Sequence, residues 1–552
     1  MRKKRILFCS EATFLNTGYA TYAREVLTYL HSTGKYEIAE LAAYAKIGDP
    51  RGAEVPWKFY GTAPADDAPE DAKASFNSTP TNQFGEWVFE DVCLDFLPDI
   101  VCDIRDFWML DFAERSPYRK YFKWCIMPTV DARPQARQWI ATYESADACL
   151  TYSDWAGKIL EDQSGGAINY IGCAPPSAHS AYKPVEDRAK HRISMGLDPN
   201  AKIIGTVMRN QRRKLFPDLF EAFRIYLDKY GDNNTFLYCH TSYPDLGWDI
   251  PELIHQNKLS SKVLMTYVCS ETKKPFVSLF KGAQTQSPYT GKKTGFVSSV
   301  KLGASYEDLS NIINTFDVYV QYANSEGFGL PQVEAAACGV PVMATDYSAM
   351  ESEVRKLEGI PLKPKALYKE LETGCYRAVP DNELAAEEFN KFFSLSEEER
   401  SELSKKTRKA FEEKYQWDIT GAMWENYFDS VEIVDPQYTW MSRPRIHQPE
   451  EKPSELPPDT NANQVVKWLI TNVLCEPERL NSVFEARMIR DLSYGSATGT
   501  TGGMYFNESS AAFDGANTRQ PFMLDNAYEH MKSLCLRRNH WESIRAERLL
   551  KR

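Results

Sequence analysis

One segment of the sequence, residues 318–346, constrains the fold more than any other. An apolar run at 318–322 precedes a turn with two glycines, and an alanine-rich run then leads into a second apolar run at 340–345. Strand, glycine turn, helix and strand in this order predict one unit of a parallel sheet, whose loop lies at the carboxyl end of its first strand. Free backbone N–H groups at the start of such a helix make the loop suitable for an anion.

Two carboxylates flank this turn: Glu326 in the loop, and Glu334 about two helical turns later. A carboxylate only accepts hydrogen bonds and can bind two neighbouring hydroxyls at once. Sugars and riboses present such pairs of hydroxyls. The whole pattern therefore predicts a nucleotide-sugar held at both ends. Either glutamate taken alone is more typical of an ordinary exposed loop or helix position.

This segment resembles the E-x7-E signature of retaining nucleotide-sugar glycosyltransferases of family 4, which have the GT-B fold, and the resemblance extends over about residues 5–432. Glu326 and Glu334 fall on the two glutamates of the signature. The resemblance implies that Glu326 contacts the transferred sugar and that Glu334 binds the donor ribose. It also implies that the turn between them faces the sugar and the diphosphate, through the backbone of Gly327, Phe328, Gly329 and Leu330.

A basic cluster at 209–214 follows a predicted strand at 201–208. Cations at the carboxyl end of a strand can neutralise a diphosphate as its bond to the sugar breaks. Arg209 and Lys214 match an arginine–lysine pair of the family, and we expect both to act in catalysis. An exposed basic patch is the alternative.

The first half of the chain supplies three further candidates. Gly18 lies between a predicted strand at 5–10 and a helix, where a ligand can approach the backbone closely. Asp106 and Asp131 follow two more predicted strands and are expected to point toward the cleft. Either aspartate is a candidate general base for the acceptor, and a helix cap or a salt bridge is the alternative role. The resemblance implies that the leaving phosphate can take the acceptor proton, so that no dedicated base is needed.

A chain of 552 residues is too long for one domain. We expect an α/β protein with two Rossmann-like domains facing across a cleft, and a mainly helical C-terminal extension. The expected parts are an acceptor-side domain at 1–180, a nucleotide-sugar-binding domain at 181–415, a helix returning to the first domain at 416–433, a proline-rich linker at 434–459 and an extension of unknown role at 460–552. Within that extension, a Gly/Ser/Thr-rich stretch at 495–503 is expected to be flexible.

Composition narrows the class of protein. No run of 18 apolar residues is present, so no transmembrane segment is expected. The 12 cysteines form no C-x-x-C pair and are typical of buried thiols in a reducing cytoplasm. We expect no metal and no cofactor, because GT-B enzymes use protein cations instead. The donor is expected to be a UDP-sugar, which is the commonest donor in the family.

The sequence thus predicts a retaining glycosyltransferase, and several alternatives stay open. The acceptor hydroxyl can belong to a saccharide, a lipid-linked carrier or a small molecule. A second possibility is glycosylation of hydroxymethylated bases in DNA, as in bacteriophages, which the basic clusters allow but the net charge of −11 does not favour. A third is a nucleotide-sugar epimerase or a non-catalytic binding protein on the same scaffold.

Overall fold

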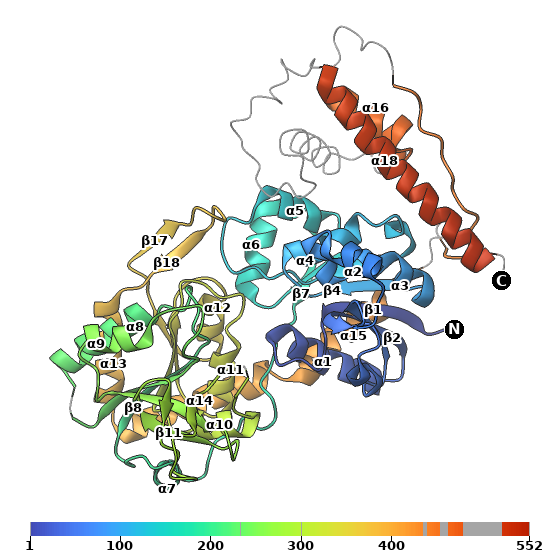
Figure 1. Ribbon diagram of the computed structural model, residues 1–552. Helices are drawn as coiled ribbons and strands as arrows, with labels where there is room; N and C mark the ends of the chain where they lie inside the picture. Colours follow the sequence, from blue (N-terminus) through green and yellow to red (C-terminus); the bar gives the residue numbers. More distant parts are fainter. Residues whose placement is uncertain are drawn as a thin grey trace.

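The computed structural model describes residues 2–231, 233–299, 301–433, 439–452, 462–477 and 521–550. Residues 434–438 and 453–459 of the predicted proline-rich linker and the whole of the stretch at 495–503 lie outside these residues. The described chain forms two α/β domains, blue to cyan and green to yellow in Figure 1, and a C-terminal extension.

The first domain contains one parallel sheet of seven strands, in the order β3-β2-β1-β4-β5-β6-β7. The strands at its centre are nearly continuous buried runs, as in other parallel sheets whose two faces are covered by helices. The strands are β1 (Lys4–Glu11), β2 (Tyr36–Lys46), β3 (Lys58–Ala63), β4 (Ile100–Asp103), β5 (Lys123–Ile126), β6 (Ala148–Thr151) and β7 (Tyr170–Cys173). The α-helices are α1 (Gly18–Ser32), α2 (Glu70–Asn77), α3 (Phe89–Phe96), α4 (Phe107–Glu114), α5 (Arg137–Glu144) and α6 (Asp154–Ser164).

The second domain has a sheet of nine strands, whose main path runs β12-β13-β10-β9-β8-β14-β15-β16. The strands are β8 (Lys202–Val207), β9 (Thr235–His240), β10 (Val263–Cys269), β11 (Pro275–Leu279), β12 (Gln284–Thr285), β13 (Gly295–Val297), β14 (Val318–Gln321), β15 (Val342–Thr345) and β16 (Ile360–Leu362). β11, β12 and β13 add antiparallel pairs at the edge beside β10. The parallel part, from β10 to β16, carries the site described below.

The helices of the second domain begin and end with recognisable signals. Ser305 and Asp308 form a capping box at the start of α10, and Ser396 and Glu399 form another at the start of α14. The α-helices are α7 (Arg188–Ser194), α8 (Phe216–Lys229), α9 (Ile250–Gln256), α10 (Tyr306–Ile313), α11 (Leu330–Ala337), α12 (Ala349–Lys356), α13 (Asn382–Ser394) and α14 (Glu397–Lys414). A separate antiparallel hairpin, β17 (Ala366–Lys369) and β18 (Tyr376–Val379), projects toward the first domain (Figure 1).

Helix α15 (Trp417–Ser430) packs against α1 of the first domain, so the chain crosses back after the second domain. Trp424 is fully buried, and its Nε1 donates a hydrogen bond of 2.9 Å to the Tyr22 hydroxyl. Thr420 and Tyr415 bond to the segment that links the domains, through Pro175 and Ser177 respectively. These contacts join the two domains through α15.

The extension contains α16 (Ala462–Trp468), a π-helical turn (Leu469–Val473), the long helix α18 (Pro521–Arg545) and a second π-helical turn (Ala546–Leu550). α16 and α18 share a small apolar cluster of their own. The end of α18 docks on the first domain: Glu542 accepts hydrogen bonds from Tyr121 and Arg545, each at 2.7 Å. In Figure 1, α18 (red) runs outward from this contact.

Candidate active site

A cavity of about 480 Å³ lies between the two domains, at the carboxyl ends of their parallel strands. Loops after β1, β4 and β5 line it from the first domain, and loops after β8 and β14 line it from the second. The β17–β18 hairpin contributes the residues Thr373, Cys375 and Arg377. This is the position at which open α/β sheets bind ligands.

The turn between β14 and α11 requires glycine at two places. Gly329 has φ +87° and caps the start of α11, a left-handed conformation that favours glycine. A Cβ on Gly327 would lie 2.4 Å from the Thr129 side chain of the first domain, so only glycine lets the two domains approach here. The Glu326 N–H donates to the Ser348 hydroxyl at 2.8 Å, which fixes the beginning of the turn.

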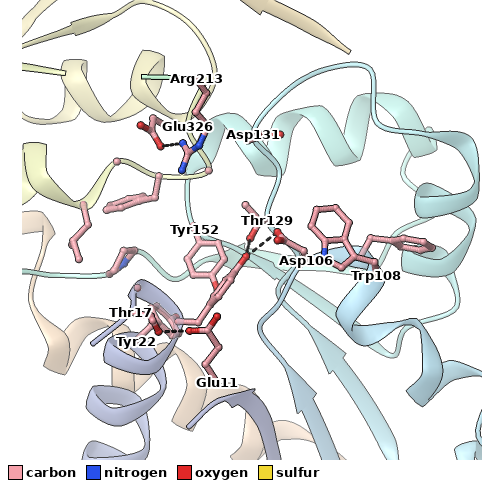
Figure 2. A pocket seen from close by; sticks show the side chains of 18 of the residues that line it. Glu11, Thr17, Tyr22, Asp106, Trp108, Thr129, Asp131, Tyr152, Arg213 and Glu326 are labelled. Atoms are coloured by element: carbon pink, nitrogen blue, oxygen red, sulfur yellow. Dashed lines mark hydrogen bonds and ion pairs between the residues drawn. The ribbon is translucent and has the colours of Figure 1, made fainter. Parts of the chain in front are cut away.

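Glu326 is the centre of a dense polar cluster. Its carboxylate accepts hydrogen bonds from Lys214, from Arg213, and from Gln321 at 2.9 Å. Figure 2 shows Arg213 and Glu326 joined on one side of the cavity. Lys214 is buried, and burial, together with the neighbouring Arg213, holds the pKa of its ammonium well below the ordinary value. The Lys214 and Arg213 side chains thus share one carboxylate, that of Glu326.

The other predicted donor-binding residues lie farther from the cavity. Arg209 is half exposed and pairs with Asp245 at 3.2 Å, and it is not part of the cavity lining. Glu334 lies buried on α11, also outside the lining. Burial raises the pKa of Glu334 to about 7. The structure therefore brings Lys214, Glu326 and residues 327–330 together. Lys214 contacts the cavity through Glu326, and Lys214, Arg209 and Glu334 are not themselves part of the cavity lining.

Gly18 and Asp106 line the cavity from the first domain. Asp106 stands at the N-cap position of α4, but its side chain makes no capping hydrogen bond. Instead it accepts a hydrogen bond of 2.8 Å from the Tyr19 hydroxyl, which also lies 2.5 Å from the Thr129 hydroxyl. Burial raises the pKa of Asp106 above its ordinary value. Figure 2 shows this group across the cavity from Arg213.

Asp131 also lines the cavity, and it bridges the domains. Its carboxylate pairs with Arg377 of the β17–β18 hairpin at 2.9 Å. Arg377 in turn donates to Ser325 at 2.6 Å and to Glu370 at 3.0 Å. In this structure Asp131 therefore forms the salt bridge that the sequence left open as its alternative role.

Several lining residues were not singled out from the sequence. Arg213 adjoins Lys214, so the basic cluster carried a signal for it, but the family pattern pointed to Arg209. Trp108 follows Asp106 by two positions, so the same sequence pattern could have indicated it. No sequence pattern pointed to Arg377 or Tyr19. Arg377 reaches the cavity through a hairpin far along the chain, and Tyr19 through contacts between loops.

No three His, Cys, Asp or Glu side chains of the described residues are grouped as metal ligands would be. None of the helices seen in the described ranges has the length and apolarity needed to cross a membrane.

Comparison with known proteins agrees with this architecture. Residues 298–410 match the family described as Glycosyl transferases group 1. No curated protein matches the sequence. Similar solved structures include sucrose-phosphate synthase from Thermosynechococcus elongatus, with 16% identity, a TM-score of 0.56, and coverage of 78% of this chain and 98% of that one.

Two further similar structures hold nucleotide ligands. A trehalose-6-phosphate protein from E. coli, bound with UDP-2-fluoro glucose, has 12% identity and a TM-score of 0.52, and the match covers 78% of this chain and all of that one. Anabaena Alr3699/HepE, in complex with UDP and glucose, has 13% identity and a TM-score of 0.53 with the same coverage. The predicted two-domain α/β architecture is confirmed. The chain has the GT-B fold, and its residues 298–410 match the glycosyl transferases group 1 family.

Proposed function

We propose that this protein is a retaining glycosyltransferase that moves a sugar from a nucleoside-diphosphate sugar to an acceptor hydroxyl. The observation that carries the proposal is the cluster of Glu326, Lys214 and Arg213 beside the glycine turn of α11, at an interdomain cavity. Such a cluster combines cations for a diphosphate with an acceptor group for sugar hydroxyls.

The donor diphosphate would dock against the start of α11, where free N–H groups and the helix dipole favour an anion. Its oxygens would replace Glu326 as partners of Arg213 and Lys214. Arg213 offers a planar fork to phosphate oxygens, and Lys214 offers a point charge. Glu326, released from the cations, would then accept hydrogen bonds from hydroxyls of the transferred sugar.

The chemical step breaks the bond between the anomeric carbon and the diphosphate oxygen, and the acceptor oxygen forms its bond on the same face of the sugar. The acceptor proton goes to the leaving phosphate oxygen. Lys214 and Arg213 would stabilise the charge that develops on that oxygen. The Asp131 carboxylate is occupied by Arg377 at 2.9 Å, which supports a phosphate oxygen rather than Asp131 as the proton acceptor.

Glu334 and Arg209 would complete the donor site from outside the present cavity lining. Glu334 would bind the two ribose hydroxyls, and its burial supports this role because a buried carboxylate without a cation gains most from two hydroxyl donors. Arg209 would exchange Asp245 for a phosphate oxygen, since an exposed ion pair is weak enough to break.

A uridine nucleotide is the donor that we propose first. The support comes from relatives of the same fold, whose solved structures hold UDP or a UDP-sugar. We place the enzyme in the cytoplasm, in keeping with its 12 unpaired cysteines.

A donor panel tests the proposal. The melting temperature of the protein is measured with UDP-, GDP- and ADP-sugars, because a ligand that binds only the folded state raises it. We expect one nucleotide class to raise the melting temperature and to release its diphosphate on incubation with an acceptor. Tyr230→Ala, at the end of α8 and outside the cavity lining, is the control variant. A folded protein that responds to none of the donors contradicts the proposal.

A further inference from the structure

The first-domain side of the cavity has an aromatic wall. Phe107 and Trp108 begin α4, and Trp139 lies in α5. The rings of Phe107 and Trp139 are stacked, with centroids 5.4 Å apart and planes at 24°. Trp108 meets Trp139 edge-on at 6.3 Å and remains 43% exposed. A large exposed tryptophan that belongs to a packed aromatic cluster offers a rigid surface to a ligand.

Carboxylates border this wall. Glu11 and Asp106 line the cavity beside it, and Asp131 lies toward the second domain. Asp106 accepts hydrogen bonds from the side chains of Tyr19 and Thr129, and Glu11 accepts one from Thr17. A carboxylate has about four acceptor positions, so both groups retain capacity for hydroxyl donors. Figure 2 shows Glu11, Asp106 and Trp108 on the same side of the cavity.

The positive charge of the cavity comes from the other side. Among the described lining residues, the arginines and lysines are Arg213 and Arg377, both from the second domain. Both are engaged by carboxylates, Arg213 by Glu326 and Arg377 by Asp131 and Glu370. The wall formed by the first domain is therefore aromatic and acidic, with no cation of its own in that part of the structure.

We propose that this wall is the acceptor subsite, and that the acceptor is an unphosphorylated saccharide. The apolar C–H face of a sugar ring would lie on Trp108, because aromatic faces carry negative charge and C–H edges are slightly positive. Its hydroxyls would donate to Asp106 and Glu11. The proposal rests on the proposed function for its place in the reaction, but the binding that it describes needs no donor.

The charge of the wall decides between acceptor classes. A sugar phosphate or a nucleic acid backbone would bring negative charge beside Asp106, Glu11 and Asp131, without a lysine or arginine from the first domain to neutralise it. Proteins that hold single-stranded nucleic acid combine aromatic rings with a positively charged groove. Here the rings are present without the positive groove, so the wall favours a neutral sugar over a base in DNA.

Direct binding measurements test the proposal. Methyl glycosides, the corresponding sugar 6-phosphates and a single-stranded oligonucleotide with 5-hydroxymethylcytosine are titrated by saturation-transfer NMR. We expect at least one neutral glycoside to bind more tightly than its phosphate and than the oligonucleotide. Trp108→Ala should weaken that binding about tenfold, Trp108→Phe should retain most of it, and Tyr230→Ala should leave it unchanged, since a lost ring contact of this size changes Kd by about that factor.

The result that overturns the proposal is tighter binding of the phosphates or of the oligonucleotide, or equal glycoside affinity in the Trp108→Ala variant. A transfer assay with the donor panel separates this outcome from failure of the proposed function. If sugar is transferred at the same rate by the wild type and by the Trp108→Ala variant, only the acceptor subsite is overturned. If glycosides bind at Trp108 but no donor is turned over, the proposed glycosyltransferase function is overturned and the proposed saccharide subsite stands.

Discussion

Lys214 and Glu326 form a buried ion pair between the loops that follow two neighbouring parallel strands, β8 and β14. A backbone bridge between Lys214 and Ala323 holds the two loops together. Because both side chains are withdrawn from water, the Lys214 ammonium depends on Glu326 or on another anion for its charge. The donor diphosphate is the anion that the proposed reaction supplies.

Replacing Lys214 with methionine tests its role in stabilising the leaving group. We expect kcat to fall about 100-fold, because one preorganised group at a developing charge contributes this much in other enzymes. The donor dissociation constant should change by less than tenfold. Steady-state kinetics and equilibrium binding of the donor measure the two quantities, and a weakened donor affinity with an unchanged kcat would show that Lys214 contributes only to ground-state binding.

Glu334→Gln should change stability in a pH-dependent way. The pKa of the folded-state carboxyl is about 7, above its ordinary value of 4.5. The folded protein therefore keeps a proton that the unfolded chain has lost between these values, and stability falls as pH rises from 4.5 to 7. At pH 8 the buried charge destabilises the wild type by on the order of 3 kcal/mol.

The glutamine variant removes this charge, so its melting temperature should exceed that of the wild type at pH 8 and should match it near pH 5. Thermal unfolding at the two pH values measures the difference. The donor affinity of the Glu334→Gln variant should be lower than that of the wild type, because glutamine offers the ribose hydroxyls a weaker acceptor. An equal change in melting temperature at both pH values would exclude a raised pKa for Glu334.

Arg377→Gln should loosen the contact between the β17–β18 hairpin and the first domain. Arg377 holds Asp131 across the cavity and also binds Ser325, next to Glu326. We expect a coupling free energy with Asp131→Asn of roughly 1 kcal/mol, measured as a double-mutant cycle on the donor dissociation constant. Strictly additive effects of the two substitutions would show that the ion pair does not influence the donor site.

Metal removal should leave the transfer rate unchanged within about twofold. In the proposed reaction, Arg213 and Lys214 neutralise the diphosphate, a task that divalent cations perform in other enzymes. The rate is measured before and after dialysis against EDTA, and again after addition of Mg²⁺ or Mn²⁺. A rate that disappears with EDTA and returns with either metal would refute this division of roles.

The sequence predicts the parts of this site that depend on short stretches of chain. The parallel strands, the turn at 326–330 and the helix after it follow from apolar runs and from glycines whose backbone roles are local. Asp106 and Asp131 are predictable because the carboxyl ends of parallel strands meet at one edge of the sheet, and Gly18 is predictable because a glycine at a strand-to-helix turn admits a ligand to the backbone.

Other parts depend on tertiary structure that no short pattern encodes. Arg209 and Arg213 belong to the same basic cluster, and only the conformation of the loop after β8 places Arg213 in the cavity and Arg209 beside Asp245. Arg377 reaches Asp131 because a hairpin more than 200 residues later in the chain folds toward the first domain. The aromatic wall joins residues of α4 and α5 through packing.

The most direct test of the account is a crystal structure of the protein with its UDP-sugar or with UDP. We predict that the diphosphate lies at the start of α11, within hydrogen-bonding distance of Lys214 and Arg213, and that Glu326 has left Lys214 to bind the sugar. A nucleotide bound elsewhere, or a diphosphate beside an unbroken pair of Lys214 and Glu326, would contradict the account.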